Sequence, residues 1–409
     1  MPNSHCLDEL ATYVLEKTRQ VIESCGPRPP GSEGEAKAQH LIRAELGCWT
    51  DGAAGIESFP VAAKAFLSVP LVTGILLAAA LAGYWLSPWL AVVLSGMAVT
   101  VALMEFLFYK QFLDVLFPKR TSYNVLGVQK PSGDVKRRLV LNAHPDAAHE
   151  WTLLYRFPRV FPLLLYASMV CLGAAFSLHL IGLVLMGWSV FEPGKVRGVI
   201  GVLQLAFVPT ALLGIAYTSW RHVSPGANDD LSGVFAVTGL ARYFRQAGLR
   251  MEQTELVYLI TGSEEAGLRG AKSYVRRHKY QWQDVETAVI TLDTIRDLPH
   301  LRILRRDQNG LVPHDPRVCR LLQVAGRRCG LQIGFVNTFL GATDAAAFSK
   351  AGIPSAALCA MDPHPAAYYH NRRDNWDNMD PVCIRKTAEV LLAAIHEYDI
   401  HGLAEGELP

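Results

Sequence analysis

Long stretches without a charged residue constrain this chain more than any other feature of its sequence. No Asp, Glu, Lys or Arg occurs in residues 66–104, 160–191 or 198–220. A helix that crosses the roughly 30 Å hydrocarbon core of a bilayer needs about 20 apolar residues. Residues 66–104 are long enough for two such helices, with Ser87-Pro88 as the break. Residues 160–189 and 198–220 supply one more each, joined by a polar turn at residues 192–197. We therefore expect four transmembrane helices, arranged as two hairpins.

The charges beside these stretches predict which way the chain faces. An even number of spans returns the chain to the same side, so all the polar segments share one compartment. Close to the spans, this side carries Lys64, Lys110, Lys119, Arg120, Arg156, Arg159 and Arg221. The other side offers only Lys195 and Arg197. The positive-inside rule then predicts a multi-pass protein of a cell membrane, an inner membrane in bacteria, with the polar domain and both termini in the cytoplasm.

Charge and cysteine content exclude other classes. The formal net charge of +2 over 409 residues, without a basic stripe, argues against a nucleic-acid partner. The eight cysteines form no CxxC pair and no short regular spacing, so we expect free thiols rather than a disulfide scaffold. The lipid bilayer is the partner that the composition predicts.

The remaining segments alternate between strand-like and helix-like patterns. Short apolar runs predict strands at residues 124–129, 138–142, 255–261, 287–292 and 355–359. Apolar residues at helical spacing predict helices at residues 8–24, 34–46, 232–247, 267–278, 316–329, 344–351 and 381–401. This alternation predicts an α/β domain with a mixed, largely parallel central sheet flanked by helices. We expect residues 1–65, 111–158 and 222–409 to form it, with the hairpins at residues 66–110 and 159–220 as insertions.

Acidic residues and histidines gather at the ends of these strands. Most follow a strand directly, and one lies in a Gly-containing loop ahead of a helix. They are His144, Asp146, Asp229, Glu264, Glu265, Asp293 and His370. Each fragment alone has an ordinary interpretation as a turn, a cap or a solvated helix start. Ligands of open α/β sheets bind beyond the carboxyl ends of the strands, and imidazole with carboxylate oxygen suits a catalytic zinc site. Their joint placement therefore indicates a metal site.

The order of the motifs resembles one known family. The sequence contains RPPGSEG at residues 28–34, HPD at 144–146, GANDDLSG at 226–233, GSEEAGLRG at 262–270, LDTI at 292–295 and YHNRRD at 369–374. This set resembles the co-catalytic di-zinc exopeptidases, which include bacterial leucyl aminopeptidases, glutamate carboxypeptidases and glutaminyl cyclases. The resemblance covers roughly residues 8–65, 121–150 and 222–400 and skips the hairpins. It implies the zinc-exopeptidase fold.

The resemblance also implies a ligand set. His144 and Asp293 would bind one zinc ion, Glu265 and His370 would bind a second, and Asp229 would bridge both. Two metal ions about 3.5–4 Å apart need such a bridging carboxylate. We therefore expect two zinc ions in each chain.

Two further residues receive roles from the resemblance. Glu264 would be the general base, and Asp146 would orient His144 from behind. Two positions stay ambiguous within the motifs, because Asp230 adjoins the bridging position and His364 precedes His370. The family pattern favours Asp229 and His370.

The second hairpin falls between two expected ligands of one metal centre. His144 and Asp229 are 85 residues apart (229 minus 144), whereas only a short loop separates these motifs in the soluble relatives. Few residues connect either ligand to the hairpin, so we expect the metal site to lie near the membrane, with the hairpins as a wall of the cleft. The expected substrates are then peptides or amphipathic acyl-amino acids.

The leading hypothesis is an integral-membrane zinc aminopeptidase. A glutaminyl-cyclase-like acyl transferase, a carboxypeptidase or a deacylase would use much the same residues. From another class, a non-catalytic membrane receptor or scaffold stays open, as does assembly into a homo-oligomer. A transporter is less favoured, because spans without charge offer few polar sites inside the bilayer.

Overall fold

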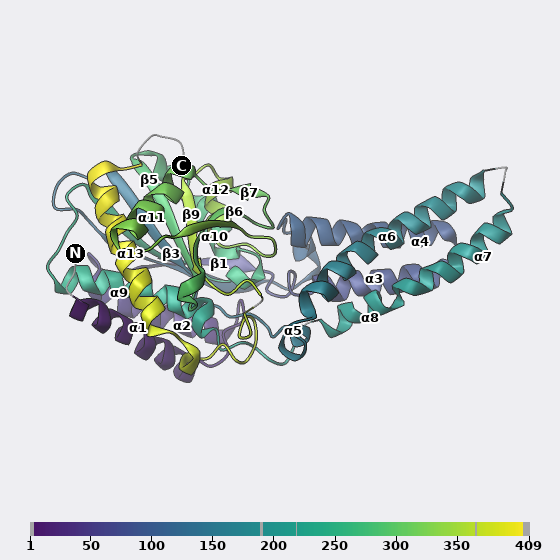
Figure 1. The fold of residues 1–409 in the computed structure, drawn as a ribbon, viewed down its shortest axis with the longest axis horizontal. Coiled ribbons are helices and arrows are strands. Elements are labelled where there is room, and N and C mark those ends of the chain that lie inside the picture. Colours follow the sequence, from purple (N-terminus) through teal and green to yellow (C-terminus); the bar gives the residue numbers. More distant parts are fainter. Residues whose placement is uncertain (1–3, 189–190, 218, 365, 404–409) are drawn as a thin grey trace. The chain divides into compact units, whose positions relative to one another are not determined.

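The computed structural model describes residues 4–188, 191–217, 219–364 and 366–403. The chain divides into two compact units (Figure 1). Residues 1–63, 119–148 and 223–409 form an α/β unit, and residues 64–118 and 149–222 form a helical unit. The predicted hairpins therefore fall within one unit, and the candidate metal ligands fall within the other.

A mixed sheet forms the centre of the α/β unit. Its strands in the described residues are β1 (Gly55–Val61), β2 (Arg120–Gln129), β3 (Arg137–Ala143), β4 (Thr254–Ile260), β5 (Glu286–Ile295), β6 (Leu301–Asp307), β7 (Val312–Pro313), β8 (Gly334–Asn337) and β9 (Ser355–Ala360). The order is β1-β2-β4-β3-β5-β9-β6-β7, and β8 pairs with β6. The central strands β4, β3, β5 and β9 run parallel, whereas β1, β2, β6 and β7 pair antiparallel with a neighbour. The predicted mixed, largely parallel sheet is confirmed.

Helices cover both faces of this sheet. One layer contains α1 (Ser4–Cys25), α2 (Glu33–Trp49), α9 (Ser232–Gln246), α11 (Pro316–Arg328) and α13 (Pro381–His401), whose apolar side chains share one core with the strands. The other layer contains α10 (Arg269–His278) and α12 (Ala345–Lys350), which pack with Trp282 over β3, β4 and β5. Figure 1 shows α11 and α13 over the strands. Burial on both faces explains why the central strands are continuous apolar runs.

Every predicted strand and helix of this unit is present, but four strands were missed. β6 carries Arg302, Arg305 and Arg306, which hide its apolar alternation. β1 contains Pro60, which edge strands tolerate because the missing N–H is not needed there. β7 and β8 are too short to give a sequence pattern.

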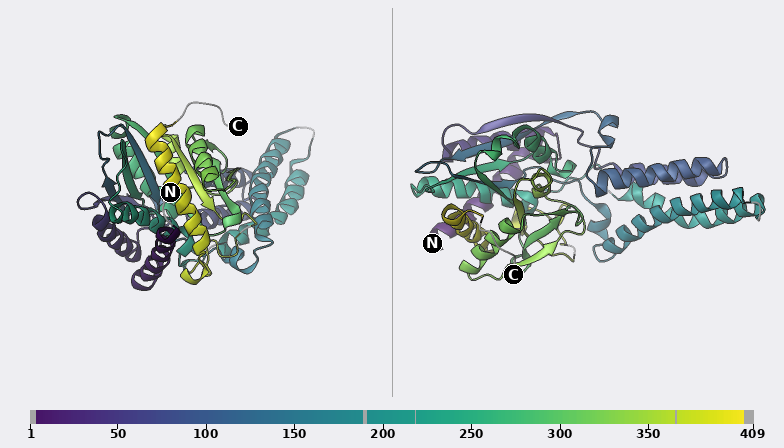
Figure 2. Two further views of the ribbon diagram at one scale, coloured as in Figure 1. Left: turned by 60° about the vertical axis from the view of Figure 1, so that its left-hand side comes forward. Right: turned by 90° about the horizontal axis from the view of Figure 1, so that it is seen from above.

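The helical unit is built from apolar helices. They are α3 (Val69–Gly83), α4 (Pro88–Val101) continued by η1 (Ala102–Leu107), α6 (Phe161–Gly187), and the series α7 (Pro193–Leu203), η3 (Gln204–Phe207) and α8 (Val208–Ala216). Two short elements, η2 (Leu113–Leu116) and α5 (Thr152–Arg156), flank them. α3 packs on α4 and α8, while α6 packs on α4 and α7; both views of Figure 2 show the long helices side by side. A Cβ at Gly74 would lie 2.8 Å from the carbonyl oxygen of Ala211, so glycine permits the close approach of α3 and α8.

The prediction of four transmembrane helices is not confirmed in full. Among the described residues, three helices are long and apolar enough to cross a membrane: Pro88–Leu107, Phe161–Gly187 and Pro193–Gly214. α3 has 15 residues, so it is roughly 22 Å long and shorter than the hydrocarbon core. It ends at Gly83 because the chain turns before Pro88 starts the next helix.

The polar turn predicted at residues 192–197 is also wrong in part. Glu192 is the N-cap of α7, and Pro193 occupies the start of that helix, where its fixed backbone angle is favourable. Lys195 and Arg197 therefore lie in the first turns of the helix. Residues 189 and 190 lie outside the described residues.

One polar cluster lies inside the helical unit. His179 of α6 is fully buried, with Nδ1 3.1 Å from Ser95 Oγ and Nε2 3.0 Å from Gln204 Oε1. The Gln204 amide donates to the Leu81 carbonyl at 3.1 Å. Since both ring nitrogens of His179 have partners on neighbouring helices, the cluster joins the helices and needs no ligand.

Candidate metal centre

The strands bring the predicted ligands to one edge of the sheet. β3 lies between β4 and β5 and runs parallel to both. Their carboxyl ends therefore meet: His144 follows β3, Glu265 follows β4, and Asp293 lies near the end of β5. Asp229 lies in η4 (Ala227–Leu231), just before α9, and His370 follows β9. The structure thus collects five residues whose first and last members are 226 positions apart (370 minus 144) in the sequence.

These residues form two donor groups that share one carboxylate. Donor atoms of His144, Asp229 and Asp293 all lie within 4.8 Å of one another, as do those of Asp229, Glu265 and His370. Asp229 Oδ1 is 3.5 Å from His144 Nε2, and Asp229 Oδ2 is 3.1 Å from His370 Nε2. Glu265 Oε1 is 3.2 Å from the same nitrogen of His370. The two oxygens of Asp229 thus face different histidines, as a bridging carboxylate requires.

The donor atoms fit a metal ion. Within the described residues, neither ring nitrogen of His144 has a hydrogen-bond partner, and the same holds for Asp229 Oδ2 and Glu265 Oε1. Buried polar atoms without a partner cost free energy, so a cluster of them indicates a bound ion or ordered water. Imidazole nitrogen and carboxylate oxygen match the preferences of zinc, and each group leaves room for a further ligand.

Mutual repulsion among the buried carboxylates also fits a site that binds a cation. Burial raises the pKa of Asp293 to about 8, and nearby Asp229 adds to the effect. Burial likewise raises the pKa of Glu264 above its usual range. Burial opposes ionisation of Asp229 too, but the contacts with His144 and His370 lower its pKa below its usual value. A divalent cation would relieve the repulsion among these carboxylates.

Asp146 holds the predicted base as well as the first histidine. Its Oδ1 is 3.4 Å from His144 Nδ1, in the position predicted for orienting that ring. The same carboxylate accepts hydrogen bonds from the backbone N–H groups of Glu264 and Glu265, both at 3.0 Å. Glu264 Oε2 lies 4.0 Å from His144 Nε2, beside the donor groups without belonging to either. The sequence predicted the contact with His144 but not the two backbone contacts.

The two ambiguous positions differ clearly in geometry. Asp230 accepts from the backbone N–H groups of His144 (3.3 Å), Gly233 (3.2 Å) and Thr294 (3.2 Å), so its carboxylate supports the loops. The Asp229–Asp230 peptide bond is cis. The side chain of His364 is 81% exposed and lies 2.8 Å from Asp362, and it does not belong to either donor group.

Two further carboxylates were not among the predicted site residues. Asp374 accepts from the N–H of Asn228 at 2.9 Å and from the N–H of Asp229 at 3.1 Å. Asp344 is buried and bonds through Oδ2 to the hydroxyl of Thr261. Asp374 ends the YHNRRD motif, and Asp344 ends the segment GATD at residues 341–344. The contacts of both acids depend on segments that are distant in the sequence.

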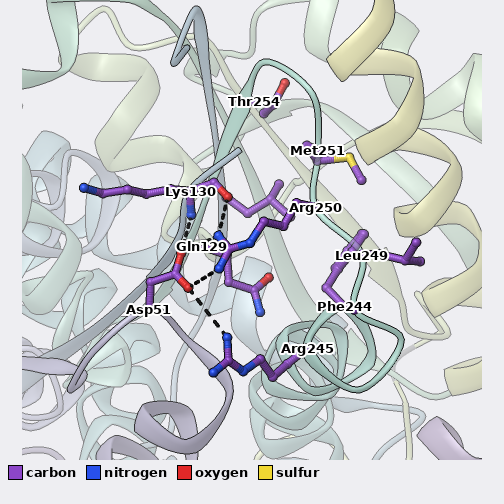
Figure 3. A pocket seen from close by; sticks show the side chains of 11 residues that line it. Asp51, Gln129, Lys130, Phe244, Arg245, Leu249, Arg250, Met251 and Thr254 are labelled. Carbon is purple, nitrogen blue, oxygen red and sulfur yellow. Dashed lines mark hydrogen bonds and ion pairs between the residues drawn. The ribbon is translucent and has the colours of Figure 1, made fainter. Parts of the chain in front are cut away.

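A separate pocket lies at the opposite end of β4. Asp51, Gln129, Lys130, Arg245 and Arg250 are among the residues that line it (Figure 3). Its cavity volume is about 130 Å³. Arg250 forms two hydrogen bonds of 2.7 Å with Asp51 and one of 2.8 Å with the Lys130 carbonyl. Its carboxylate, Asp51, is paired directly with Arg250, so this pocket lacks the unpaired buried acids of the metal centre.

A family comparison agrees with the site. Residues 213–395 match the model of peptidase family M28. This segment contains Asp229, Glu265, Asp293 and His370. His144 lies outside it, because the helical insertion separates that residue from the remaining ligands.

Solved structures share the fold. An aminopeptidase from Aneurinibacillus sp. strain AM-1 aligns with 100% of this chain and 98% of its own length, at 15% identity and a TM-score of 0.56. The zinc aminopeptidase BSAP from Bacillus subtilis covers 95% of each chain at 15% identity and 0.56. A glutaminyl cyclase from Bacteroides thetaiotaomicron covers 94% of this chain and 97% of its own at 14% identity and 0.55. The zinc-exopeptidase fold and the resemblance predicted from the motifs are confirmed. The match to the M28 model and this fold support a zinc-dependent metallo-exopeptidase, the predicted class of enzyme.

Proposed function

We propose that this protein is an integral-membrane aminopeptidase that binds two zinc ions. The observation that carries the proposal is Asp229, whose two carboxylate oxygens face separate donor groups. His144 and Asp293 complete one zinc site, and Glu265 and His370 complete the other. The zinc aminopeptidase from Bacillus subtilis with the same fold supports this choice of metal.

The residues around the metal centre divide the chemical work. When bound, zinc lowers the pKa of a water molecule and polarises the scissile carbonyl group. Glu264, buried beside the donor groups, takes the proton from that water and passes it to the leaving amine. Asp146 fixes the backbone of Glu264 and the ring of His144, so that base and ligand keep their relative position.

Two of the solved structures with this fold favour an amino-terminal substrate. The proteins from Aneurinibacillus sp. strain AM-1 and from Bacillus subtilis are both aminopeptidases. They support an aminopeptidase ahead of a carboxypeptidase as the leading proposal.

A second candidate is acyl transfer of the glutaminyl-cyclase kind. The glutaminyl cyclase from Bacteroides thetaiotaomicron has a TM-score of 0.55 against this chain, close to the value for the aminopeptidases. Incubation with a peptide that begins with glutamine separates the two activities. Release of free glutamine supports the aminopeptidase, and formation of a pyroglutamyl peptide supports the cyclase. A non-catalytic receptor is disfavoured because the complete ligand set and the base are present.

Membrane integration rests on the helical unit. Its long helices have exposed apolar side chains along their length, such as Leu163 (68% exposed) and Val170 (70% exposed) on α6. A bilayer would cover such surfaces. We propose that the α/β unit faces the cytoplasm and that substrates are peptides or amphipathic acyl-amino acids near the membrane. Only 16 residues separate His144 from the start of α6 at Phe161. Alkaline carbonate extraction of membranes tests integration, since an integral protein stays in the pellet.

Substitution of Glu264 by Gln tests the catalytic proposal. The variant should bind two zinc ions per chain and keep its unfolding temperature, yet lose about 10²–10⁴-fold in kcat on an aminoacyl p-nitroanilide. Glu255→Gln, at the start of the strand β4 that leads to Glu264, is the matched control and should retain kcat. Unimpaired hydrolysis by Glu264→Gln would exclude Glu264 as the base.

A further inference from the structure

A fully buried arginine lies behind the metal centre. Arg28 stands in the loop between α1 and α2, and its side chain is 0% exposed. Burying a guanidinium costs free energy unless its N–H groups find acceptors. Burial lowers the pKa of Arg28 to about 10, so the group still carries its charge at neutral pH. The acceptors that compensate for its burial therefore indicate what this residue does.

Arg28 donates to the backbones of two metal-ligand loops. Its Nε donates to the Pro145 carbonyl at 2.9 Å, within the segment that carries His144. Its Nη2 donates to the carbonyls of Pro225 at 2.7 Å and Gly226 at 3.2 Å, within the segment that leads to Asp229. The carbonyl of Arg28 accepts from the Ala147 N–H at 3.0 Å. One side chain thus joins the loop of the first ligand to the loop of the bridging ligand.

The two loops are the ends of the second insertion. The chain leaves the α/β unit after Ala148 and returns at Val223. Between these ends, the Ser224 N–H donates to the Ala148 carbonyl at 2.8 Å. Gly226 has a positive φ of 63°, and a Cβ there would lie 2.8 Å from the Cβ of Ala147 and 3.0 Å from Arg28 Nη2. The packing at this point leaves no room for a side chain.

Charges around Arg28 strengthen the same connection. The carboxylates of Asp146 and Asp374 attract its guanidinium. Asp146 in turn accepts from the N–H of Glu264, and Asp374 accepts from the N–H of Asp229. Arg28 therefore contacts two ligand loops directly and supports two more contacts through carboxylates.

We propose that Arg28 is a positioning residue. It holds the loop of His144 at a fixed distance from the loop of Asp229, although the second insertion separates these loops in the sequence. This inference rests on the proposed zinc function. A short connecting loop would hold two ligands together by itself, but residues 149–222, which connect these two loops, belong to the helical unit and not to the α/β unit. Non-covalent contacts must then fix the distance between the ligands, and Arg28 supplies them from one rigid, planar group.

Amide hydrogen exchange of the metal-free, full-length protein tests the proposal without any catalytic assay. In Arg28→Ala, exchange at residues 145–148 and 224–231 should rise at least tenfold, while exchange at residues 250–260 stays unchanged. Arg28→Lys should give an intermediate effect, because an ammonium group cannot donate in the same fork. Arg250→Ala is the matched control: this arginine also joins two segments, Asp51 and the Lys130 carbonyl, at the other end of the sheet.

Zinc affinity, measured by competition with a chromophoric chelator, gives the second readout. We expect a loss of about 10–100-fold in Arg28→Ala, as for other residues that support metal ligands, with partial recovery in added guanidinium at a non-denaturing concentration. Gly226→Ala disturbs the same contact from the other side and should act in the same direction if Arg28→Ala does not fold.

Either of two results would overturn the proposal. One is unchanged exchange and zinc affinity in folded Arg28→Ala; the other is an equal rise of exchange over the whole α/β unit, which means general destabilisation. If the wild-type protein binds no zinc, the proposed function fails, whereas the exchange pattern of the metal-free protein still decides the role of Arg28.

Discussion

Charged residues lie at both ends of β4, but their burial and their pairing differ. At its carboxyl end, Asp229 and its neighbours are buried, and several of their polar atoms lack partners within the described residues. At its amino end, Asp51 pairs with Arg250 and lies 3.9 Å from Arg245, at the surface (Figure 3). Both ends thus contain charged groups brought together from distant segments. Only the carboxyl end requires a cation from outside the chain to balance its charge.

The difference separates a functional cluster from a structural one. An acid that finds its partner within the protein contributes modestly to stability, whereas buried acids without such a partner cost free energy that folding must offset elsewhere. A protein keeps buried acids without a partner where the binding of a ligand offsets this free-energy cost. Residue type alone does not reveal which arrangement is present, but burial and pairing do.

The same substitution at both ends should give the largest contrast. Asp229→Asn removes the negative charge that both donor groups share. We therefore expect loss of zinc from both sites and a kcat at least 10²-fold lower. This effect should exceed that of losing a residue that only supports a ligand, because Asp229 would bind both metal ions directly. Asp51→Asn should change stability by about 1 kcal/mol or less and leave zinc content unchanged. Zinc analysis of the purified proteins and aminopeptidase assays measure both effects. Full zinc content in Asp229→Asn would remove the basis for a bridging role.

Removal of zinc should affect the two ends of β4 differently within one molecule. Ligand binding at 100 times the dissociation constant stabilises the folded state by about 2.7 kcal/mol. We therefore expect chelation to lower the unfolding temperature and to increase amide exchange at residues 262–267 and 226–231. Exchange at residues 129–131 and 248–251 should stay constant, and zinc should reverse the changes. An equal response at both ends would contradict the comparison.

The smallest expected effect is the response of the ion pair at the amino end to acid. Hydrogen bonds from Arg250 lower the pKa of Asp51 from its ordinary value of 3.8 to about 2. Because the folded state holds this proton less tightly, the stabilisation is complete above about pH 4 and disappears as the pH falls through 2. Metal-free wild type and Arg250→Ala should therefore differ in unfolding temperature at pH 5 and converge near pH 2. A constant difference over this range would exclude the ion pair as its source.

The candidate ligands could be selected from the sequence because most of them adjoin a predicted strand end or a helix start. His144 and Asp293 lie at the ends of apolar runs that suit buried strands, and both runs form strands of the central sheet. Their role as zinc ligands stays a prediction. The contacts of Arg28 could not be predicted, because its acceptors are backbone carbonyls 117 and 197 residues away. Asp146 likewise holds backbone groups that no side-chain pattern identifies.

Hydropathy predicted the apolar segments but not where the helices begin and end. The length of the charge-free stretch predicted two transmembrane helices in residues 66–104. The first of them, however, starts at Val69 and already ends at Gly83. In the second hairpin, Lys195 and Arg197 lie inside a helix that starts with Pro193. Helix ends depend on capping and on packing against neighbours, and an apolar count contains neither.

Anomalous diffraction at the zinc absorption edge from crystals of the zinc-loaded protein tests the central claim most directly. The account predicts two peaks about 3.5–4 Å apart, one beside His144 and Asp293 and the other beside Glu265 and His370, with Asp229 between them. Zinc peaks only elsewhere in the molecule, or none at these residues, would contradict it.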